Sequence, residues 1–296
     1  MSTAGFKLVE LDGEPGSKLG IAHIPVVLDA FGANLRHIRK VVFYASEIGV
    51  ETLILPYSSA FGQVIEVYSN RMEPGELRRR YAIDAEHPYI KALRYLSTSY
   101  GVSIASPGVI ERIRGWYYIS TIFVHKDSGT LISQRKIVVS SEEKRVGVRP
   151  GREIVVFDDG RLKYLVLLSN EILAPEIGRL GVIEGGNILI TVLPPLKPLE
   201  DYTTILKAIA RMLGVWVVNV GGLYLIESNL HALNSMVIDP GGRTVLLHQD
   251  STPGLITISF KKIRQLLEAD EREFNATDVL KLVLKHYRRT RGKSSF

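Results

Sequence analysis

Apolar and polar positions follow two periods along the chain, one helical and one extended. Leu35, Ile38, Val42 and Ala45 recur at helical spacing and predict an amphipathic helix over 33–48. Several short, nearly continuous apolar runs bounded by Pro or Gly are typical of buried strands. The pattern predicts strands over 19–25, 51–55, 102–110, 116–125, 130–138, 163–168, 188–192, 215–220, 233–238, 244–248 and 255–259, and further helices over 87–100, 175–184 and 199–213.

The two halves of the chain repeat one order of elements: strand, helix, strand, helix, then paired strands. Because each sheet must bury an apolar face, this order predicts an α/β protein with sheets inside and helices outside. No linker rich in Pro, Gly or Ser divides the chain, so we expect one domain over 19–275. Residues 1–18 are expected to form an appended strand or N-terminal arm, and residues 276–296 a C-terminal helix and basic tail, with Asn275 or Thr277 as the helix cap.

The composition excludes several kinds of chemistry. The 296 residues include no cysteine, 46% are apolar and 23% are charged. The chain therefore has no disulfide, cysteine-ligated zinc site, iron–sulfur cluster or thiol nucleophile. No apolar run reaches the roughly 18–20 residues of a membrane helix, and residues 1–20 lack a signal-peptide core. We expect a cytoplasmic globular protein without membrane contact, and the few glutamines and absent cysteine favour a thermophilic source.

The net charge of +6 comes from one end of the chain. From Val279 onward, six basic residues occur without an acidic one: Lys281, Lys285, Arg288, Arg289, Arg291 and Lys293. Without these six, basic and acidic residues are equal in number. A DNA-binding protein needs a basic face on its body, so nucleic acid is not an expected partner of this chain.

A series of short motifs runs along the chain between about Gly20 and about Glu273. The motifs are, in order, Asn34-Leu35, Pro56, Pro107-Gly108, Glu111, Gly115, Tyr118, Gln134-Arg135-Lys136-Ile137, Glu142-Glu143, Pro150-Gly151, 163–180 with Pro175-Glu176 and Arg179, Asn219, Gly222, Ser235, Asp239-Pro240 and Gly242. In this order they resemble the nitrilase, or carbon–nitrogen hydrolase, superfamily. The resemblance implies a four-layer αββα sandwich and a homodimer. The C-terminal segments of that family commonly cross to a second subunit; a solvated end and a contact with an acidic partner or RNA are the other interpretations of the tail.

The resemblance also implies a catalytic constellation, of which this chain keeps only a part. In the family, a Glu acts as general base, a Lys stabilises the tetrahedral anion, a Cys attacks the amide or nitrile carbon, and a second Glu assists. The Lys corresponds to Lys136, while Tyr57 stands at the position of the base and Ser169 at that of the nucleophile. Glu171 replaces an Asp two residues after the nucleophile. Glu142 or Glu143 corresponds to the second Glu, and Glu142, Glu143 and Glu171 are the candidate substrate-binding residues.

These replacements change what the site can do. A phenol with an ordinary pKa of about 10 donates protons at neutral pH, and a serine needs a strong base to become a nucleophile. We therefore expect a site without thiol chemistry that binds a small amide- or carboxylate-like ligand. Lys136 would then pair with Glu142, Glu143 or Glu171. The alternatives are a Ser–Lys amide hydrolase that uses Ser169 and Lys136, and a non-catalytic structural or partner subunit.

The remaining candidate residues support no further chemistry from their spacing alone. His231 lies in a polar segment and is interpreted either as a pocket-mouth residue or as a solvated loop residue. The other histidines lack the spacing of metal ligands, so neither a metal nor a cofactor is expected. Residues 116–118, Trp-Tyr-Tyr, are interpreted first as a strand and second as a stacking platform for bases.

Overall fold

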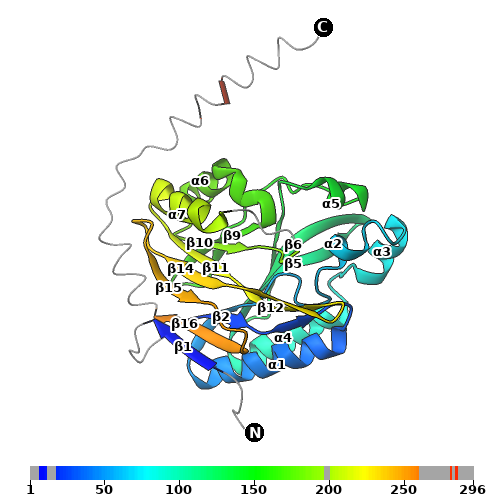
Figure 1. The fold of residues 1–296 in the computed structure, drawn as a ribbon, viewed down its shortest axis with the longest axis horizontal. Helices are drawn as coiled ribbons and strands as arrows, with labels where there is room; N and C mark the ends of the chain where they lie inside the picture. Colours follow the sequence, from blue (N-terminus) through cyan, green and yellow to red (C-terminus); the bar gives the residue numbers. More distant parts are fainter. Residues whose placement is uncertain (1–6, 12–17, 197–200, 260–280, 282–283, 286–296) are drawn as a thin grey trace.

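Two sheets lie face to face in the centre of the molecule (Figure 1). The computed structural model describes residues 7–11, 18–196, 201–259, 281, 284 and 285. The first sheet runs in the order β1 (Lys7–Leu11), β16 (Gly254–Ser259), β2 (Lys18–His23), β4 (Val50–Ile54), β5 (Ser103–Ile113), β6 (Trp116–Val124) and β7 (Leu131–Arg135). The second runs in the order β15 (Thr244–His248), β14 (Ser235–Ile238), β11 (Trp216–Val220), β10 (Ile188–Val192), β9 (Lys163–Leu168) and β8 (Phe157–Asp158).

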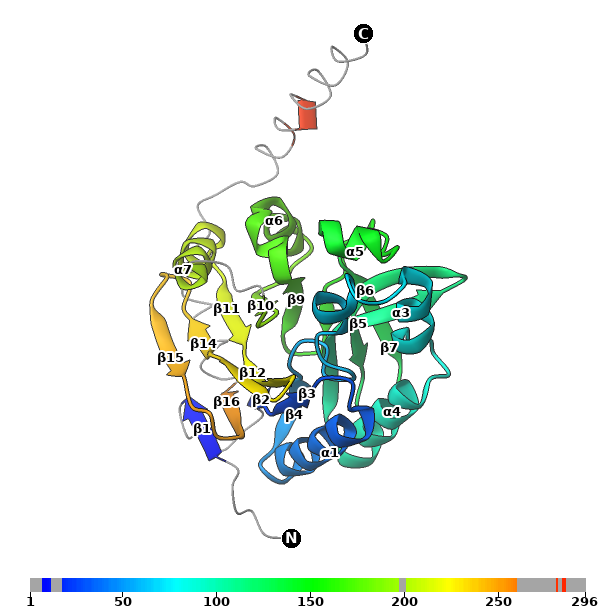
Figure 2. The ribbon, with the colours of Figure 1, turned by 45° about the vertical axis from the view of Figure 1, so that its right-hand side comes forward.

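Helices cover the outer face of each sheet. Figures 1 and 2 show α1 (Phe31–Glu47) and α4 (Pro88–Tyr100) on one side of the molecule, and α6 (Pro175–Ile183) and α7 (Tyr202–Leu213) on the opposite side. This arrangement confirms the predicted αββα sandwich. Among the described residues, no helix is both long and apolar enough to cross a membrane. The smaller elements are α2 (Val64–Tyr68), α3 (Pro74–Tyr81), α5 (Ser141–Arg145), a 3₁₀ turn η1 (Ser169–Leu173), and a three-stranded sheet of β13 (Asn229–Leu233), β12 (Gly222–Ile226) and β3 (Pro25–Val27).

The alternation of side chains along each strand explains the layering. In β9, Val166 and Leu168 pack between the two sheets, whereas Leu165 and Leu167 pack under the outer helices of the second sheet. Both faces of this strand are therefore apolar, and its sequence is a continuous apolar run. Strand β4 of the first sheet and strand β9 of the second each have a parallel neighbour, and they end at Ile54 and Leu168. Tyr57 and Ser169 therefore both follow the carboxyl ends of strands. Ligands of open α/β sheets bind at such ends.

Two details differ from the sequence prediction, and a third makes it more specific. The strand expected over 130–138 ends at Arg135, because the backbone N–H groups of Ile137 and Val138 turn to the carboxylate of Glu171 instead of a neighbouring strand. Within the expected N-terminal arm, Lys7–Leu11 pairs in parallel with β16 and so belongs to the first sheet. Several elements of five to eight residues were not predicted, since they are too short to show a period. The expected C-terminal helix and basic tail lie largely outside the described residues.

Two histidines meet where the two sheets join. The rings of His23, on β2, and His248, on β15, are 4.6 Å apart between centroids. Nε2 of His23 lies 2.9 Å from the carbonyl oxygen of Asp250, and Nδ1 lies 3.4 Å from the hydroxyl of Ser235. Burial, and then the neighbouring His248, lower the pKa of His23 to about 4. Burial also lowers the pKa of His248.

The His23 environment predicts a loss of stability in mild acid. Because the pKa of His23 is depressed in the folded state, the unfolded state binds more protons below pH 6.5, so stability falls as the pH falls toward 4. Between pH 7 and pH 5 this group is expected to lower the free energy of unfolding by about 2 kcal/mol. Urea unfolding at both pH values measures the loss.

The matched variants are His23→Asn, which is expected to shrink the pH-dependent loss, and His125→Asn, which is expected to leave it unchanged. His125 lies at a partly exposed turn beside Asp127. If the free energy of unfolding fell equally between pH 7 and pH 5 in wild type and His23→Asn, the loss could not be attributed to His23.

Candidate functional site

The side chain of Lys136 is buried at the end of β7, where the first sheet meets the loop after it. The residue is 1% exposed, and its Nζ lies 2.5 Å from Oε1 of Glu143. Its backbone is fixed on both sides: the N–H donates to the carbonyl of Ile119, and its own carbonyl accepts from the N–H of Gly151, both at 2.7 Å. Of the three carboxylates that the sequence offered as partners, Lys136 therefore forms its ion pair with Glu143.

Glu143 is held in place by the start of a short helix. The Ser-x-x-Glu spacing of Ser140 and Glu143 forms a capping box on α5, in which each side chain accepts from the other's backbone N–H. Oε2 of Glu143 lies 2.6 Å from the backbone nitrogen of Ser140, so both carboxylate oxygens have donors. Glu142, in contrast, accepts from the hydroxyl groups of Ser140 and Ser141. The structure thus separates the two adjacent glutamates, which the sequence left as alternatives.

Tyr57 lies three residues beyond β4 and is 2% exposed. Its ring packs on Gly108, in an irregularity of β5; a Cβ atom at Gly108 would lie 2.7 Å from the ring. The hydroxyl donates a hydrogen bond to Glu66 of α2. Burial, followed by the charges of Glu66 and Glu143, raises the pKa of Tyr57 well above its ordinary value. The phenol is therefore a neutral proton donor at physiological pH.

Ser169 directly follows β9 and adopts a left-handed backbone conformation with φ of 55°. Such a conformation is strained for a residue with a side chain, and it turns the chain sharply from strand to 3₁₀ turn. Glu171, two residues later, is fully buried and accepts from the backbone N–H groups of Leu168 at 2.9 Å and Ile137 at 2.6 Å. Its carboxylate thereby joins the Ser169 turn to the segment that carries Lys136. Burial raises the pKa of Glu171 despite these donors.

A hollow of about 390 Å³ opens beside this buried cluster. Its wall includes Glu66, the partner of the Tyr57 hydroxyl, and His231, which lies on strand β13 and not in a loop. Lys136, Ser169 and Tyr57 are not part of the wall. The sequence offered no sign of Glu66, because the five residues of α2 are too few for a helical period. The other wall residues are Val67, Asn70, Arg71, Leu196, Ile226, Glu227 and Asn229.

The described side chains favour binding and positioning chemistry. The ammonium of Lys136 is paired with Glu143, and the buried carboxylates of Glu143 and Glu171 accept from backbone N–H groups. The phenol of Tyr57 donates to a third carboxylate, that of Glu66. Within the described ranges, no group of three or more His, Asp or Glu side chains is arranged to hold a metal ion.

Breaking the Lys136–Glu143 pair is expected to destabilise the fold. Lys136→Met would leave the Glu143 carboxylate buried without its counter-ion, which costs about 3–5 kcal/mol. Lys136→Met/Glu143→Gln should recover part of this loss, because Gln is neutral and still accepts from Ser140. Urea unfolding at pH 7 measures both variants. A cost below about 1 kcal/mol for the single variant would mean that water reaches the pair.

Comparison with known proteins places this geometry in a family. The model of the family described as "Carbon-nitrogen hydrolase" matches residues 18–266. A comparison with curated proteins finds no match. Among solved structures, the NitN amidase from Nesterenkonia sp. AN1 aligns with a TM-score of 0.67 at 18% identity, covering 87% of this chain and 97% of that one.

A second solved structure extends the comparison to a eukaryote. Saccharomyces cerevisiae Nit3, a member of branch 10 of the nitrilase superfamily, aligns with a TM-score of 0.68 at 16% identity, covering 88% of this chain and 96% of that one. At these identities the structural likeness shows a shared fold, whereas the family model covers most of the sequence itself. The chain therefore belongs to the carbon–nitrogen hydrolase family.

Proposed function

We propose that this chain is a member of the carbon–nitrogen hydrolase family that lacks Cys-dependent hydrolysis and binds a small amide- or carboxylate-like ligand. The observation that carries the proposal is the state of Lys136 and Tyr57. Lys136 is paired at 2.5 Å with Glu143, and Tyr57 is a buried phenol whose pKa is raised. Neither group can take the proton from the Ser169 hydroxyl.

The Ser–Lys alternative conflicts with the ion pair. To act as a general base, a lysine must first lose its proton, and a carboxylate in contact with the ammonium opposes that loss. The two oxygens of Glu143 accept from Lys136 and from the Ser140 N–H, so the carboxylate cannot turn away without leaving both donors. Glu171 is committed in the same way to the backbone of Leu168 and Ile137. The carboxylates of the cluster therefore serve structure.

Ligand binding is supported by the hollow beside the cluster. Its volume of about 390 Å³ lies within the usual range of small-molecule sites. Asn70, Asn229 and His231 provide hydrogen-bond donors and acceptors suited to an amide or a carboxylate, and Arg71 is fixed by an ion pair with Glu227. One amidase of the same fold was solved in complex with butyramide, at 17% identity and a TM-score of 0.66.

The homodimer remains a prediction. It is supported by large apolar side chains that are exposed on the outer helices of the second sheet: Leu180 and Ile183 on α6 and Met212 on α7. A second copy of the chain would bury them.

The proposal predicts no turnover of amides or nitriles. Purified protein, Ser169→Ala and Ser169→Cys should all give the same background rate with a panel of aliphatic amides and nitriles, measured by ammonia release. Ser169→Cys is the sharp variant, because it restores a thiol but leaves Tyr57 where a base is needed. Hydrolysis that Ser169→Ala abolishes would establish the Ser–Lys alternative; hydrolysis gained by Ser169→Cys would show that a base exists elsewhere.

Binding is measured separately. Butyramide and butyrate serve as probes, and at about one hundred times its dissociation constant a bound probe should stabilise the protein by about 2.7 kcal/mol in thermal unfolding. His231→Leu should reduce this stabilisation, while His125→Leu, distant from the hollow wall, should not. Equal stabilisation in all three proteins would place the ligand outside the hollow.

A further inference from the structure

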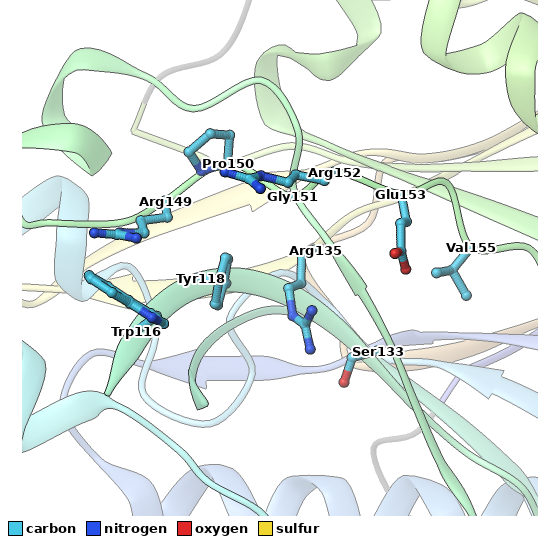
Figure 3. A pocket seen from close by; sticks show the side chains of 10 residues that line it. All are labelled: Trp116, Tyr118, Ser133, Arg135, Arg149, Pro150, Gly151, Arg152, Glu153 and Val155. Atoms are coloured by element: carbon cyan, nitrogen blue, oxygen red, sulfur yellow. The ribbon is translucent and has the colours of Figure 1, made fainter. Parts of the chain in front are cut away.

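A second hollow, of about 350 Å³, lies at the opposite edge of the first sheet from β1. Its walls come from β6, from the edge strand β7 and from segment 149–155, which runs beside β7 (Figure 3). The segment is anchored by two backbone hydrogen bonds, from Arg149 N–H to the Tyr117 carbonyl and from Gly151 N–H to the Lys136 carbonyl. Lys136, Tyr57 and Ser169 contribute nothing to these walls, so the hollow is separate from the site described above.

Three arginines give the hollow its charge. Arg149 and Arg152 are exposed, and within the described residues neither has a carboxylate at ion-pair distance. Arg135 forms an ion pair with Glu111, in which Nε lies 3.3 Å from Oε2. Glu153 is the acidic residue on the wall, and Figure 3 shows it beside Val155, at the other end of the hollow from Arg149. The Arg149 end is therefore strongly cationic.

Aromatic rings alternate with these cations. The guanidinium of Arg149 stacks over the ring of Trp116, and that of Arg135 lies 4.9 Å from the centroid of the Tyr118 ring. Trp116 is 47% exposed, so part of its ring is accessible to a ligand. Figure 3 shows Arg149 above Trp116, and Tyr118 between Trp116 and Arg135. Such a row offers flat surfaces for stacking and guanidinium groups for anions at the same place.

We propose that this hollow binds a small phosphate monoester that carries a planar ring, of the nucleoside monophosphate class. A guanidinium group binds phosphate oxygens with two parallel hydrogen bonds, and two unpaired arginines match the two charges of a phosphate monoester. A carboxylate would neutralise only one of them. The planar ring stacks against Trp116 and Tyr118, and the volume suits one small ligand.

The charge distribution selects a single small anion over a nucleic acid strand. Outside the six basic residues after Val279, basic and acidic residues of the chain are equal in number. Glu153 lines the hollow and would repel the further phosphates of a polyanion, and Glu111 already pairs with Arg135. The cationic surface is thus local.

The chain supplies its own probe for the test. It has two tryptophans, and Trp216 is fully buried, so a fluorescence change on binding reports Trp116. Adenosine monophosphate should change the fluorescence saturably, with a dissociation constant below about 1 mM. Adenosine alone and inorganic phosphate alone should each bind at least about tenfold more weakly. Absence of a saturable signal, or equal binding of phosphate alone, would overturn the proposal.

Matched variants locate the site. Arg149→Ala/Arg152→Ala should weaken adenosine monophosphate binding at least about tenfold, whereas Arg39→Ala, an exposed arginine on α1, should leave it unchanged. Both arginines are exposed and form no ion pair with the part of the chain that the structure describes, so the double variant should fold; circular dichroism and thermal unfolding check this. Unchanged binding of adenosine monophosphate by the double variant would show that the ligand does not bind in this hollow. Binding of a single-stranded oligoadenylate without binding of the monophosphate would contradict the proposal that the ligand is a small phosphate monoester.

Discussion

The arrangement of the site depends on one buried carboxylate that holds two chain segments together. Glu171 accepts from the N–H of Leu168 at the end of β9 and from the N–H of Ile137 after β7, so it ties the end of the second sheet to the edge of the first. Lys136 precedes Ile137 and Ser169 follows Leu168 in the sequence. These two bonds therefore also determine how the segments that carry Lys136 and Ser169 lie relative to each other. A buried acceptor with several backbone donors is costly to disturb, because each donor would otherwise lose its partner away from water.

This constraint is independent of catalysis. A carboxylate that orders the backbone keeps the site's shape when the side chains that do chemistry change. The strained φ of Ser169 is explained in the same way, since the surrounding bonds hold the turn. A capping box and the ion pair between Lys136 and Glu143 further fix the position of the Lys136 side chain. The geometry around Lys136 is therefore maintained by backbone hydrogen bonds, a helix cap and an ion pair.

Long, periodic segments were predictable from the sequence, and short or distant ones were not. Helix α1 and strands β9 to β11 show their periods directly, because each buries a whole face or stripe. The choice of Glu143 over Glu142 as the partner of Lys136 could not be predicted, since it depends on which glutamate closes the cap with Ser140. Glu66 could not be predicted either, because α2 is too short to show a period and because only the folded chain brings this helix to Tyr57 after β4. The row of Arg149, Trp116, Tyr118 and Arg135 likewise combines residues from two strands and a loop.

The order of strands in the first sheet has a consequence for how the molecule forms. Strands β1 and β2, near the start of the chain, flank β16, which begins at Gly254. During synthesis these first strands have no partner on that side until nearly the whole chain has been made. Contacts between such distant segments slow folding, because a long loop must close before they contribute stability. The part of the sheet formed by β1, β16 and β2 is therefore the last part of the sandwich that can close, and a nascent chain that stops short of β16 leaves β2 open to wrong partners.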